Sequence, residues 1–251
     1  MNNLSKQGIR RTFDRAARTY DAYCSVQQTI AQRAIRLLLA HQQVFDRIVD
    51  FGCGTGESTA CLMQHVRATQ CYAVDFSEQL LSVAKHKLAD HLGITWIHGD
   101  FDQPISFAQP VELIFSNMAL QWSSDVQYTL DLWNTYLAQR GLLLFSVPIA
   151  GNFSELKACY RKHFLSDSQM IALLSSRDGV LMAQDQLSIR QSFTSQYAAL
   201  TSLKATGTNY HHGDALKGRG LARVRPEIFF VDRDCSQLTY HVGIYLIRKT
   251  A

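Results

Sequence analysis

The fold of this chain is decided by eight residues, Val49-Asp50-Phe51-Gly52-Cys53-Gly54-Thr55-Gly56. The apolar residues that end at Phe51 predict the end of a buried strand, and residues 57–66 predict a helix. Between them, the spacing Gly-x-Gly-x-Gly allows a tight backbone turn. It also allows a ligand to lie against the main chain with no side chain in between. The stretch therefore predicts a strand, a ligand-binding turn and a helix.

A second strand end extends this prediction. Asp75 follows Gly56 by nineteen residues and comes directly after the apolar run 71–74. A doubly wound sheet binds a nucleoside with a glycine turn after one strand and an acid at the tip of the next, where the acid meets the ribose hydroxyls. The two features together predict an α/β sheet that binds a nucleoside.

Composition narrows the class of protein. The chain has 251 residues, of which 47% are hydrophobic and 18% charged, as expected of a globular domain. No apolar run approaches the roughly 20 residues of a membrane helix. The six cysteines form no Cys-x-x-Cys pair and no cluster with zinc spacing. We expect a soluble, cytoplasmic protein without a metal, a membrane anchor or a nucleic-acid partner.

Positive charge is concentrated in two places. The first twenty residues carry the whole net charge of +4, since the remaining charges cancel. They contain Lys6, Arg10, Arg11, Arg15 and Arg18, with Asp14 as their one acid. A second basic cluster consists of Lys217, Arg219, Arg223 and Arg225. Either cluster can meet an acidic partner, and either can equally be a solvated face.

Hydrophobic periodicity gives the order of the elements. Helices are predicted over 9–20 and 26–40, and a βαβ rhythm follows. Its strands are predicted over 47–51, 70–75, 94–98, 111–116 and 142–147. Further helices are predicted over 57–66, 78–91 with Ser77 as N-cap, and 126–137 closed by Arg140-Gly141. Beyond residue 150, helices are predicted over 154–164, 168–175 and 195–205, and strands over 187–193 and 238–247.

These elements predict one domain with an α/β fold, a doubly wound and mostly parallel sheet of seven strands. Helices within residues 1–44 precede the sheet, and residues 45–193 form the cofactor-binding core. Residues 194–237 form a helical cap, and residues 238–251 hold the final strand.

Polar and aromatic residues follow four consecutive strands. They are the turn 52–56, then Asp75-Phe76, Asp100-Phe101 and the run 116–122. Ligands of such sheets bind at the carboxyl ends of the strands. Each of these residues alone can be a strand residue or a helix cap. The four in chain order indicate one nucleoside site.

The charge beside the turn bears on the choice of nucleoside. Dinucleotide sites carry Gly-x-Gly-x-x-Gly and place a pyrophosphate at the helix N-terminus. Here the third glycine comes one residue early, and Asp50 and Glu57 flank the turn. Carboxylates repel a pyrophosphate but suit a cationic tail, such as the amino and sulfonium groups of S-adenosylmethionine. A dehydrogenase stays open as an alternative.

Residues 45–150 resemble the class I S-adenosylmethionine-dependent methyltransferases, which have a Rossmann-like fold. The resemblance implies that the methionine end lies along Asp50, Gly52, Cys53, Gly54 and Gly56. It implies that Asp75 binds the ribose with Phe76 beside the adenine. It places the adenine amino group on Asp100 with Phe101 near the ring, and the floor under the sulfonium at Asn117 and Met118.

A narrower likeness covers most of the chain. The motifs are residues 11–17, Tyr20-Asp21, Gln27, 102–104, 116–122, 203–209 and 238–242. They resemble the malonyl-acyl carrier protein O-methyltransferases of biotin synthesis, and the likeness is weakest over 215–237. It implies methyl transfer from S-adenosyl-L-methionine to the free carboxylate of a malonyl thioester. The implied partner is malonyl-acyl carrier protein or malonyl-coenzyme A. An acidic carrier fits a basic patch.

This chemistry needs no catalytic acid or base. A carboxylate with a pKa near 4 is ionised at pH 7 and attacks the sulfonium methyl directly. We therefore expect no catalytic side chain, only residues that hold the acceptor. The candidates are Tyr20, Gln121, Trp122 and Lys204, each of which core packing or a solvated helix face also explains.

Other functions fit the same cofactor turn. One is a methyltransferase for a small free acid such as trans-aconitate, which needs several cations in its pocket. Another methylates a quinone or a hydroxylated ring and needs a base. A third is an assembly factor that binds S-adenosylmethionine without methylating.

Overall fold

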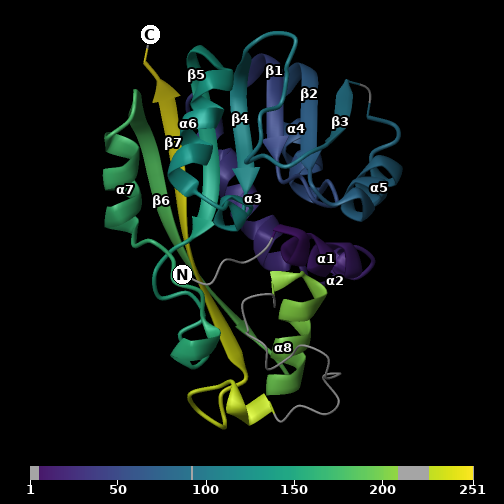
Figure 1. Ribbon diagram of the computed structural model, residues 1–251, viewed down its shortest axis with the longest axis vertical. Helices are drawn as coiled ribbons and strands as arrows, with labels where there is room; N and C mark the ends of the chain where they lie inside the picture. Colours follow the sequence, from purple (N-terminus) through teal and green to yellow (C-terminus); the bar gives the residue numbers. More distant parts are fainter. Residues whose placement is uncertain (1–5, 92, 209–225, 251) are drawn as a thin grey trace.

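The computed structural model describes residues 6–91, 93–208 and 226–250 and contains one seven-stranded sheet (Figure 1). Its strand order is β3-β2-β1-β4-β5-β7-β6. The first five strands are parallel and are β1 (Val44–Phe51), β2 (Arg67–Asp75), β3 (Ile94–His98), β4 (Val111–Asn117) and β5 (Leu137–Pro148). The predicted fold class is thereby confirmed.

Two antiparallel strands complete the sheet. β7 (Gln237–Lys249) lies between β5 and β6 (Gly179–Ser192) and is antiparallel to both. Its pairing with β5 ends at Pro148↔Val242, whereas its pairing with β6 continues to Ser192↔Gln237. Residues 237–241 therefore pair only with β6. In Figure 1 this two-stranded ribbon extends past the rest of the sheet to helix α8 (Gln196–Ala205).

Helices cover both faces of the sheet. On one face, β1 contributes Ile48 to a core shared with α3 (Ser25–Leu39) and α4 (Glu57–His65). On the other face, Val49 joins a core that includes residues of α1, α5, α6 and α7. These four helices are Lys6–Ala16, Glu78–Lys87, Val126–Tyr136 and Asp167–Ser175. The alternation of Ile48 and Val49 between two cores is the pattern of a strand buried on both sides.

Several predicted boundaries are confirmed. β3 has the predicted bounds, and the Ser77 side chain caps α5 by accepting a hydrogen bond from the Leu80 amide. Four shorter helices connect the larger elements within the described residues. They are α2 (Tyr20–Tyr23) and the 3-10 helices η1 (Leu120–Trp122), η2 (Ala158–Tyr160) and η6 (Pro226–Ile228). Among the described residues, no helix combines the length and the apolar character needed to cross a membrane.

The helix predicted over 9–20 is wrong beyond Ala16, because α1 ends there. Thr19 donates a hydrogen bond from its hydroxyl to the Ala16 carbonyl and lies within 3.2 Å of the Ala205 carbonyl. A hydroxyl that bonds to nearby backbone competes with the helix. The chain turns at this point, and α2 places Tyr20 at the carboxyl ends of the strands.

The α-helix predicted over 154–164 is also wrong. Leu156 is buried and forms an isolated β-bridge with Phe230, and the Lys157 amide donates to the Phe229 carbonyl. Pairing with a distant segment replaces the local helix that the periodicity favours. Similarly, Arg140-Gly141 lies inside β5 rather than after α6, where Arg140 has a positive φ of 60°.

The core beneath the site allows a direct test of stability. Trp133 of α6 is fully buried, stacks on Phe51 with 4.9 Å between ring centroids, and donates to the Phe101 carbonyl. We expect Trp133→Ala to lower the free energy of unfolding by about 3–5 kcal/mol. Tyr128→Ala on the same helix, where Tyr128 is 50% exposed, should change it by less than about 0.5 kcal/mol. Urea denaturation measures both, and equal effects would contradict the packing.

Candidate functional site

Three small pockets lie at the carboxyl ends of the parallel strands. The turn pocket follows β1 and is bordered by Gly52, Gly54 and Ser58. The ring pocket lies beside Asp75 and Phe101. The cap pocket reaches Tyr240 and α8. The turn pocket has a volume of about 30 Å³, the ring pocket about 40 Å³ and the cap pocket about 50 Å³. Tyr20 lines all three, so α2 joins them into one site.

The glycine turn rests on the end of β2. The amides of Gly52 and Cys53 both donate to the Val74 carbonyl, at 2.8 and 3.1 Å. A Cβ at Gly52 would lie 2.3 Å from the Ala119 Cβ, so no side chain fits there. At Gly54, by contrast, a Cβ would meet no atom within 4 Å. The turn therefore packs against protein at Gly52 and faces open space at Gly54.

Asp75 lies between the turn and α5. Its carboxylate accepts hydrogen bonds from the amides of Gly54 and Ser77, at 2.9 and 2.8 Å. The Ser77 hydroxyl in turn donates to Asp14 of α1. Burial raises the pKa of the Asp75 carboxyl to about 6. Each of its oxygens retains a lone pair that can accept a ligand hydroxyl.

Asp50 lies beneath the turn and outside the lining of the three pockets. It is fully buried, and one of its oxygens accepts hydrogen bonds from Thr59 and Ser58. The other oxygen, Oδ1, has no hydrogen-bond partner among the described residues. Burial raises the pKa of this carboxyl to about 7.

The charge of Glu57 is compensated. Lys87 of α5 pairs with Glu57 at 2.6 Å and with Asp21 of α2 at 2.5 Å. Asp21 also accepts a hydrogen bond from the Thr55 hydroxyl. The negative potential expected from Asp50 and Glu57 is therefore weaker than the sequence indicates, because Glu57 is paired and Asp50 is partly protonated near pH 7.

Asp100 meets Lys6, which the sequence pattern assigned only to the amino-terminal basic cluster. The Lys6 ammonium lies 3.0 Å from Asp100 Oδ1 and 2.8 Å from Asp102 Oδ2. It also lies 4.8 Å from the centroid of the Phe101 ring and 6.0 Å from that of Phe76. Asp100 is not part of the pocket lining, but Phe101 and Phe76 both line the ring pocket. Lys6 thus lies over two of the rings that line this pocket.

The end of β4 is held from two sides. Asn117 donates to the Gln27 carbonyl of α3 and accepts from the Ser146 hydroxyl of β5. Met118 then has a positive φ of 54°, and its amide donates to Ser146. Non-glycine residues held in this region of backbone space cluster at functional sites.

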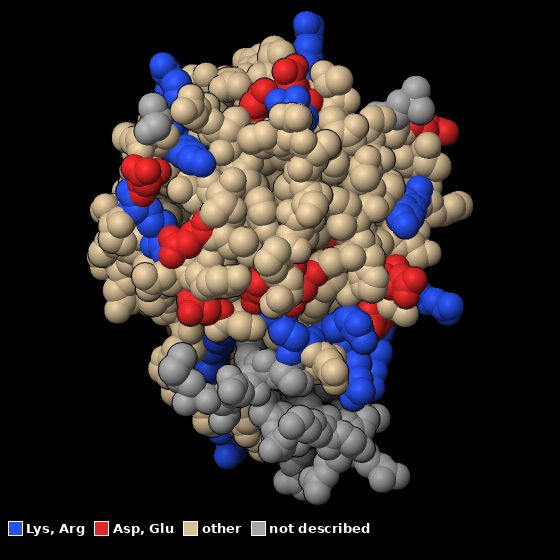
Figure 2. Space-filling view, turned by 45° about the horizontal axis from the view of Figure 1, so that its top comes forward, with Lys and Arg blue, Asp and Glu red and all other residues tan. Residues whose placement is uncertain are grey.

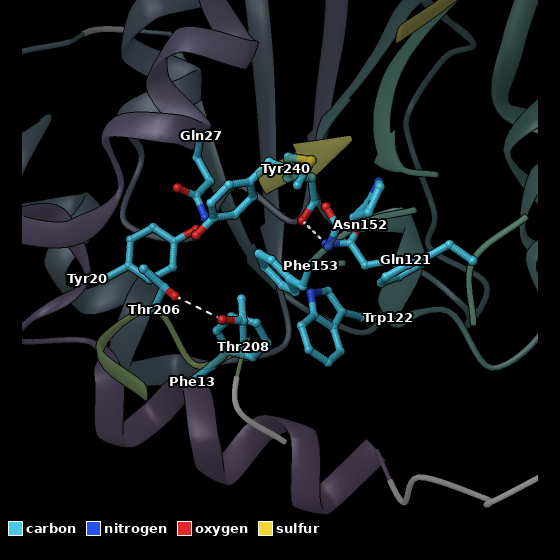
Figure 3. A pocket seen from close by; sticks show the side chains of 13 residues that line it. Phe13, Tyr20, Gln27, Gln121, Trp122, Asn152, Phe153, Thr206, Thr208 and Tyr240 are labelled. Carbon is cyan, nitrogen blue, oxygen red and sulfur yellow. Dashed lines mark hydrogen bonds between the residues drawn. The ribbon is translucent and has the colours of Figure 1, made fainter. Parts of the chain in front are cut away.

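The cap pocket collects polar groups from distant elements. Figure 3 shows the side chains of Tyr20, Gln27 and Tyr240 pointing toward one another. Gln27 is buried, and its Oε1 has no partner among the described residues. Burial raises the pKa of both phenols far above the ordinary value, so both stay protonated. Thr206 and Thr208 supply hydroxyls on the α8 side (Figure 3).

The four candidates for acceptor binding separate in the structure. Tyr20, Gln121 and Trp122 line the cap pocket. Gln121 is buried, donates to the Met118 carbonyl and has an unpartnered Oε1. Lys204, in contrast, is exposed and lines none of the three pockets, as a solvated residue of α8 does. Residue 209 and the basic cluster within 217–225 lie outside the described residues.

Comparison with known proteins identifies the family. Residues 48–141 match a methyltransferase domain. Malonyl-[acyl-carrier protein] O-methyltransferase 2 of Coxiella burnetii is 33% identical over 249 residues, which cover 99% of this chain and 98% of that protein. The chain belongs to the malonyl-[acyl-carrier protein] O-methyltransferase family. It is therefore a methyltransferase.

Solved structures of other methyltransferases share the fold. The N-methyltransferase NodS of Bradyrhizobium japonicum WM9, in complex with S-adenosyl-L-homocysteine, has a TM-score of 0.51 at 15% identity and covers 88% of this chain and 86% of its own. Magnesium protoporphyrin IX methyltransferase of Synechocystis PCC 6803, with bound S-adenosylmethionine, has a TM-score of 0.54 at 12% identity, over 89% of this chain and 79% of its own. At these identities the likeness concerns the fold alone.

The turn of this methyltransferase allows a paired test. We expect Gly54→Ala to fold, at a cost of about 1–2 kcal/mol for its left-handed backbone, because its Cβ meets no atom. The added methyl group would occupy the ligand side of the turn and raise the dissociation constant for S-adenosylhomocysteine at least tenfold. Gly52→Ala should lose stability instead, because its Cβ overlaps Ala119. Thermal unfolding and calorimetric titration separate the two effects, and unchanged affinity in Gly54→Ala would contradict this geometry.

The raised carboxyl pKa values predict how binding depends on pH. Asp50 and Asp75, with pKa values of about 7 and 6, carry protons in the lower part of the range from pH 6 to 8. A cationic ligand favours their ionised forms, so binding releases protons and tightens as pH rises. We expect the dissociation constant for S-adenosylmethionine to fall about tenfold over this range, which corresponds to one pKa unit.

Two variants of β1 control this measurement. Asp50→Asn should remove most of the pH dependence, because the amide does not titrate. Asp46→Asn, on the exposed part of the same strand, should keep it. A dissociation constant that does not change with pH in the unmodified protein would disprove the coupling.

Proposed function

We propose that this methyltransferase transfers the methyl group of S-adenosyl-L-methionine to the free carboxylate of malonyl-acyl carrier protein, an early step of biotin synthesis. The observation that carries the proposal is the likeness to the Coxiella burnetii enzyme over nearly the full length of both chains. A likeness of this extent includes the cap pocket as well as the glycine turn. We treat the chain as one domain that works in the cytoplasm.

The residues present fit the cofactor. Open space beside Gly54 and the unpartnered oxygen of Gln27, which lines the turn pocket, suit an amino-acid tail that donates hydrogen bonds, and the Asp50 carboxylate beneath the turn adds negative charge. We assign the ribose hydroxyls to Asp75 and the adenine ring to the ring pocket with Phe76 and Phe101. Lys6 occupies Oδ1 of Asp100, which leaves Oδ2 for the adenine amino group.

The remaining cofactor contacts follow from the same arrangement. The methionine end lies along the turn formed by Gly52, Cys53, Gly54 and Gly56. Asn117 and Met118 form the floor under the sulfonium. Bound S-adenosylmethionine would supply a methyl group that the positive charge on its sulfur makes electrophilic.

The side chains of the cap pocket position the acceptor. The phenols of Tyr20 and Tyr240 stay protonated and donate hydrogen bonds to a carboxylate rather than act as bases. The aromatic rings of Phe13, Trp122 and Phe153 exclude water from the same space. A desolvated and aligned carboxylate needs no base, and alignment of two reactants contributes about 7–11 kcal/mol. Gln121 fixes the position of Met118 through its hydrogen bond.

The alternatives find less support. A tricarboxylate such as trans-aconitate needs several cations, but no Lys or Arg appears among the described residues that line the cap pocket. A ring hydroxyl needs a base, and the two phenols of the pocket are held protonated. An intact acceptor pocket beside the turn disfavours a factor that only binds the cofactor.

Transfer of radiolabel from S-adenosylmethionine tests the proposed function. We expect label on malonyl-acyl carrier protein, with malonyl-coenzyme A as a slower acceptor and trans-aconitate as a weak competitor. Alkaline hydrolysis should release the label, because the product is a methyl ester. If neither malonyl thioester takes up label, the proposed function is wrong.

Basic residues of α1 and of the turn that follows it are the described candidates for carrier docking. Arg10, Arg11, Arg15 and Arg18 are exposed, and Figure 2 shows Lys and Arg side chains gathered on one face of the molecule. We expect Arg11→Glu with Arg15→Glu to raise the KM for malonyl-acyl carrier protein about tenfold at low salt, since charge complementarity governs encounter. The KM for malonyl-coenzyme A and the affinity for S-adenosylhomocysteine should stay constant.

A matched reversal far from the site controls for net charge. Arg67 begins β2 at the opposite end of the sheet, and Arg36 is exposed in the last turn of α3, shortly before the start of β1. Arg67→Glu with Arg36→Glu makes the same change in net charge and should leave the KM for the carrier within twofold. If both double variants raise that KM equally, α1 is not the docking surface.

A further inference from the structure

A groove of about 590 Å³ adjoins the cap pocket and contains a lysine that has no assigned role. The groove lies between α1, the start of α6, the end of β5 and α7. Its lining includes Ile9, Trp122, Asp125, Pro148, Lys162 and Met170. Gln121, Trp122, Pro148 and Phe164 line both the groove and the cap pocket, so the two spaces adjoin along these residues.

Lys162 lies at this boundary. Its ammonium donates to the Gln121 carbonyl and lies 5.6 Å from the centroid of the Trp122 ring and 5.9 Å from that of Phe164. Within residues 6–91, 93–208 and 226–250, no carboxylate lies within ion-pair distance of it. Asp125 lines the same groove, but its carboxylate caps α6.

A half-buried ammonium without a counter-ion is costly unless a ligand supplies the charge. Burial, together with the positive charge of Lys6, lowers the pKa of Lys162 to about 8. The aromatic rings and the single carbonyl compensate only part of the lost hydration. The position therefore suits an anionic group that arrives with the substrate.

We propose that Lys162 recognises the free carboxylate of the acceptor and that the groove admits the thioester arm of its carrier. This inference rests on the proposed function. The Gln121 carbonyl holds the ammonium, and the Gln121 side chain bonds to Met118, the proposed floor of the reaction site. A carboxylate paired with Lys162 thus lies beside the place of methyl transfer.

The pairing selects the substrate over the product. During transfer, a carboxylate oxygen forms a bond to the methyl carbon while the carbon–sulfur bond breaks and its electron pair stays on sulfur. No proton moves. The carboxylate loses its negative charge, so its attraction to Lys162 is strong before the reaction and weak afterwards. Lys162 therefore retains the malonyl thioester and releases the methyl ester.

This asymmetry gives a kinetic signature. An interaction that is stronger in the ground state than in the transition state lowers KM without raising kcat. We expect Lys162→Met to raise the KM for malonyl-acyl carrier protein at least tenfold with kcat unchanged or higher. Lys162→Arg keeps the cation and should stay within threefold of the unmodified enzyme. The dissociation constant for S-adenosylhomocysteine should stay within twofold in both variants.

Lys157 provides the matched control, because it is an exposed lysine of the same segment. Lys157→Met should leave kcat and KM unchanged. Inhibition by the methyl ester product supplies a second measure. The unmodified enzyme should bind the malonyl thioester more tightly than its ester, and Lys162→Met should bind the two about equally.

The pH profile tests the proposal without a substitution. The KM of the unmodified enzyme should rise as pH increases through about 8, because the neutral amine no longer attracts the carboxylate. Other charged or titratable groups face Lys162: Asp125 and His163 line the same groove, and the positive charge of Lys6 lowers the pKa of Lys162. The variant Lys162→Arg keeps these groups but replaces the titrating amine, so it controls for their contribution to the pH profile. In that variant the rise should be absent.

Results other than those expected above contradict the proposed role of Lys162. An unchanged KM in Lys162→Met, or a fall in kcat without a rise in KM, excludes recognition of the carboxylate. A parallel loss of S-adenosylhomocysteine binding indicates a structural role instead. If the unmodified enzyme transfers no label to malonyl-acyl carrier protein, the proposed function itself fails. If it does and the Lys162 variants behave like it, only this inference fails.

Discussion

The turn between β1 and α4 imposes the constraint on which the site depends. Gly52 has a positive φ of 76° and no room for a Cβ, and its amide and that of Cys53 share the Val74 carbonyl. The turn is thus fixed to the end of β2 rather than free to follow its helix. Asp75, the next residue of β2, then reaches back to Gly54. One strand end positions both the turn and the acid beside it.

The amino-terminal helices complete what the sheet begins. Asp21 bonds to Thr55 after β1, Asp14 to Ser77 after β2, and Lys6 to Asp100 after β3. At the end of β4, Asn117 donates to the Gln27 carbonyl. Each of the first four strand ends makes at least one such bond. The sheet alone therefore presents a row of polar groups, and the helices before it convert that row into an enclosed site around Tyr20.

Local sequence predicted the features that depend on local geometry. The turn, β3 and the Ser77 cap follow from glycine spacing, apolar runs and a hydroxyl before a helix. Lys162 could not be predicted, because its position depends on a distant contact, the bridge between Leu156 and Phe230, that replaces the local helix expected over 154–164. Lys204 shows the converse, since its motif lies at the site while its side chain faces solvent. The negative charge expected beside the glycine turn was overestimated for the same reason. The lysine that pairs with Glu57, Lys87, lies on a different helix, α5.

The ribbon formed by residues 237–241 of β7 and the end of β6 extends past the rest of the sheet toward α8 (Figure 1). Tyr240 lies on this extension, past the last pairing of β7 with β5. The glycine turn follows β1, and two strands, β4 and β5, separate β1 from β7, so substitutions on the ribbon reshape the acceptor wall with two strands between them and the turn. Descendants of such a chain can exchange one acceptor for another while inheriting an unaltered methyl-donor site.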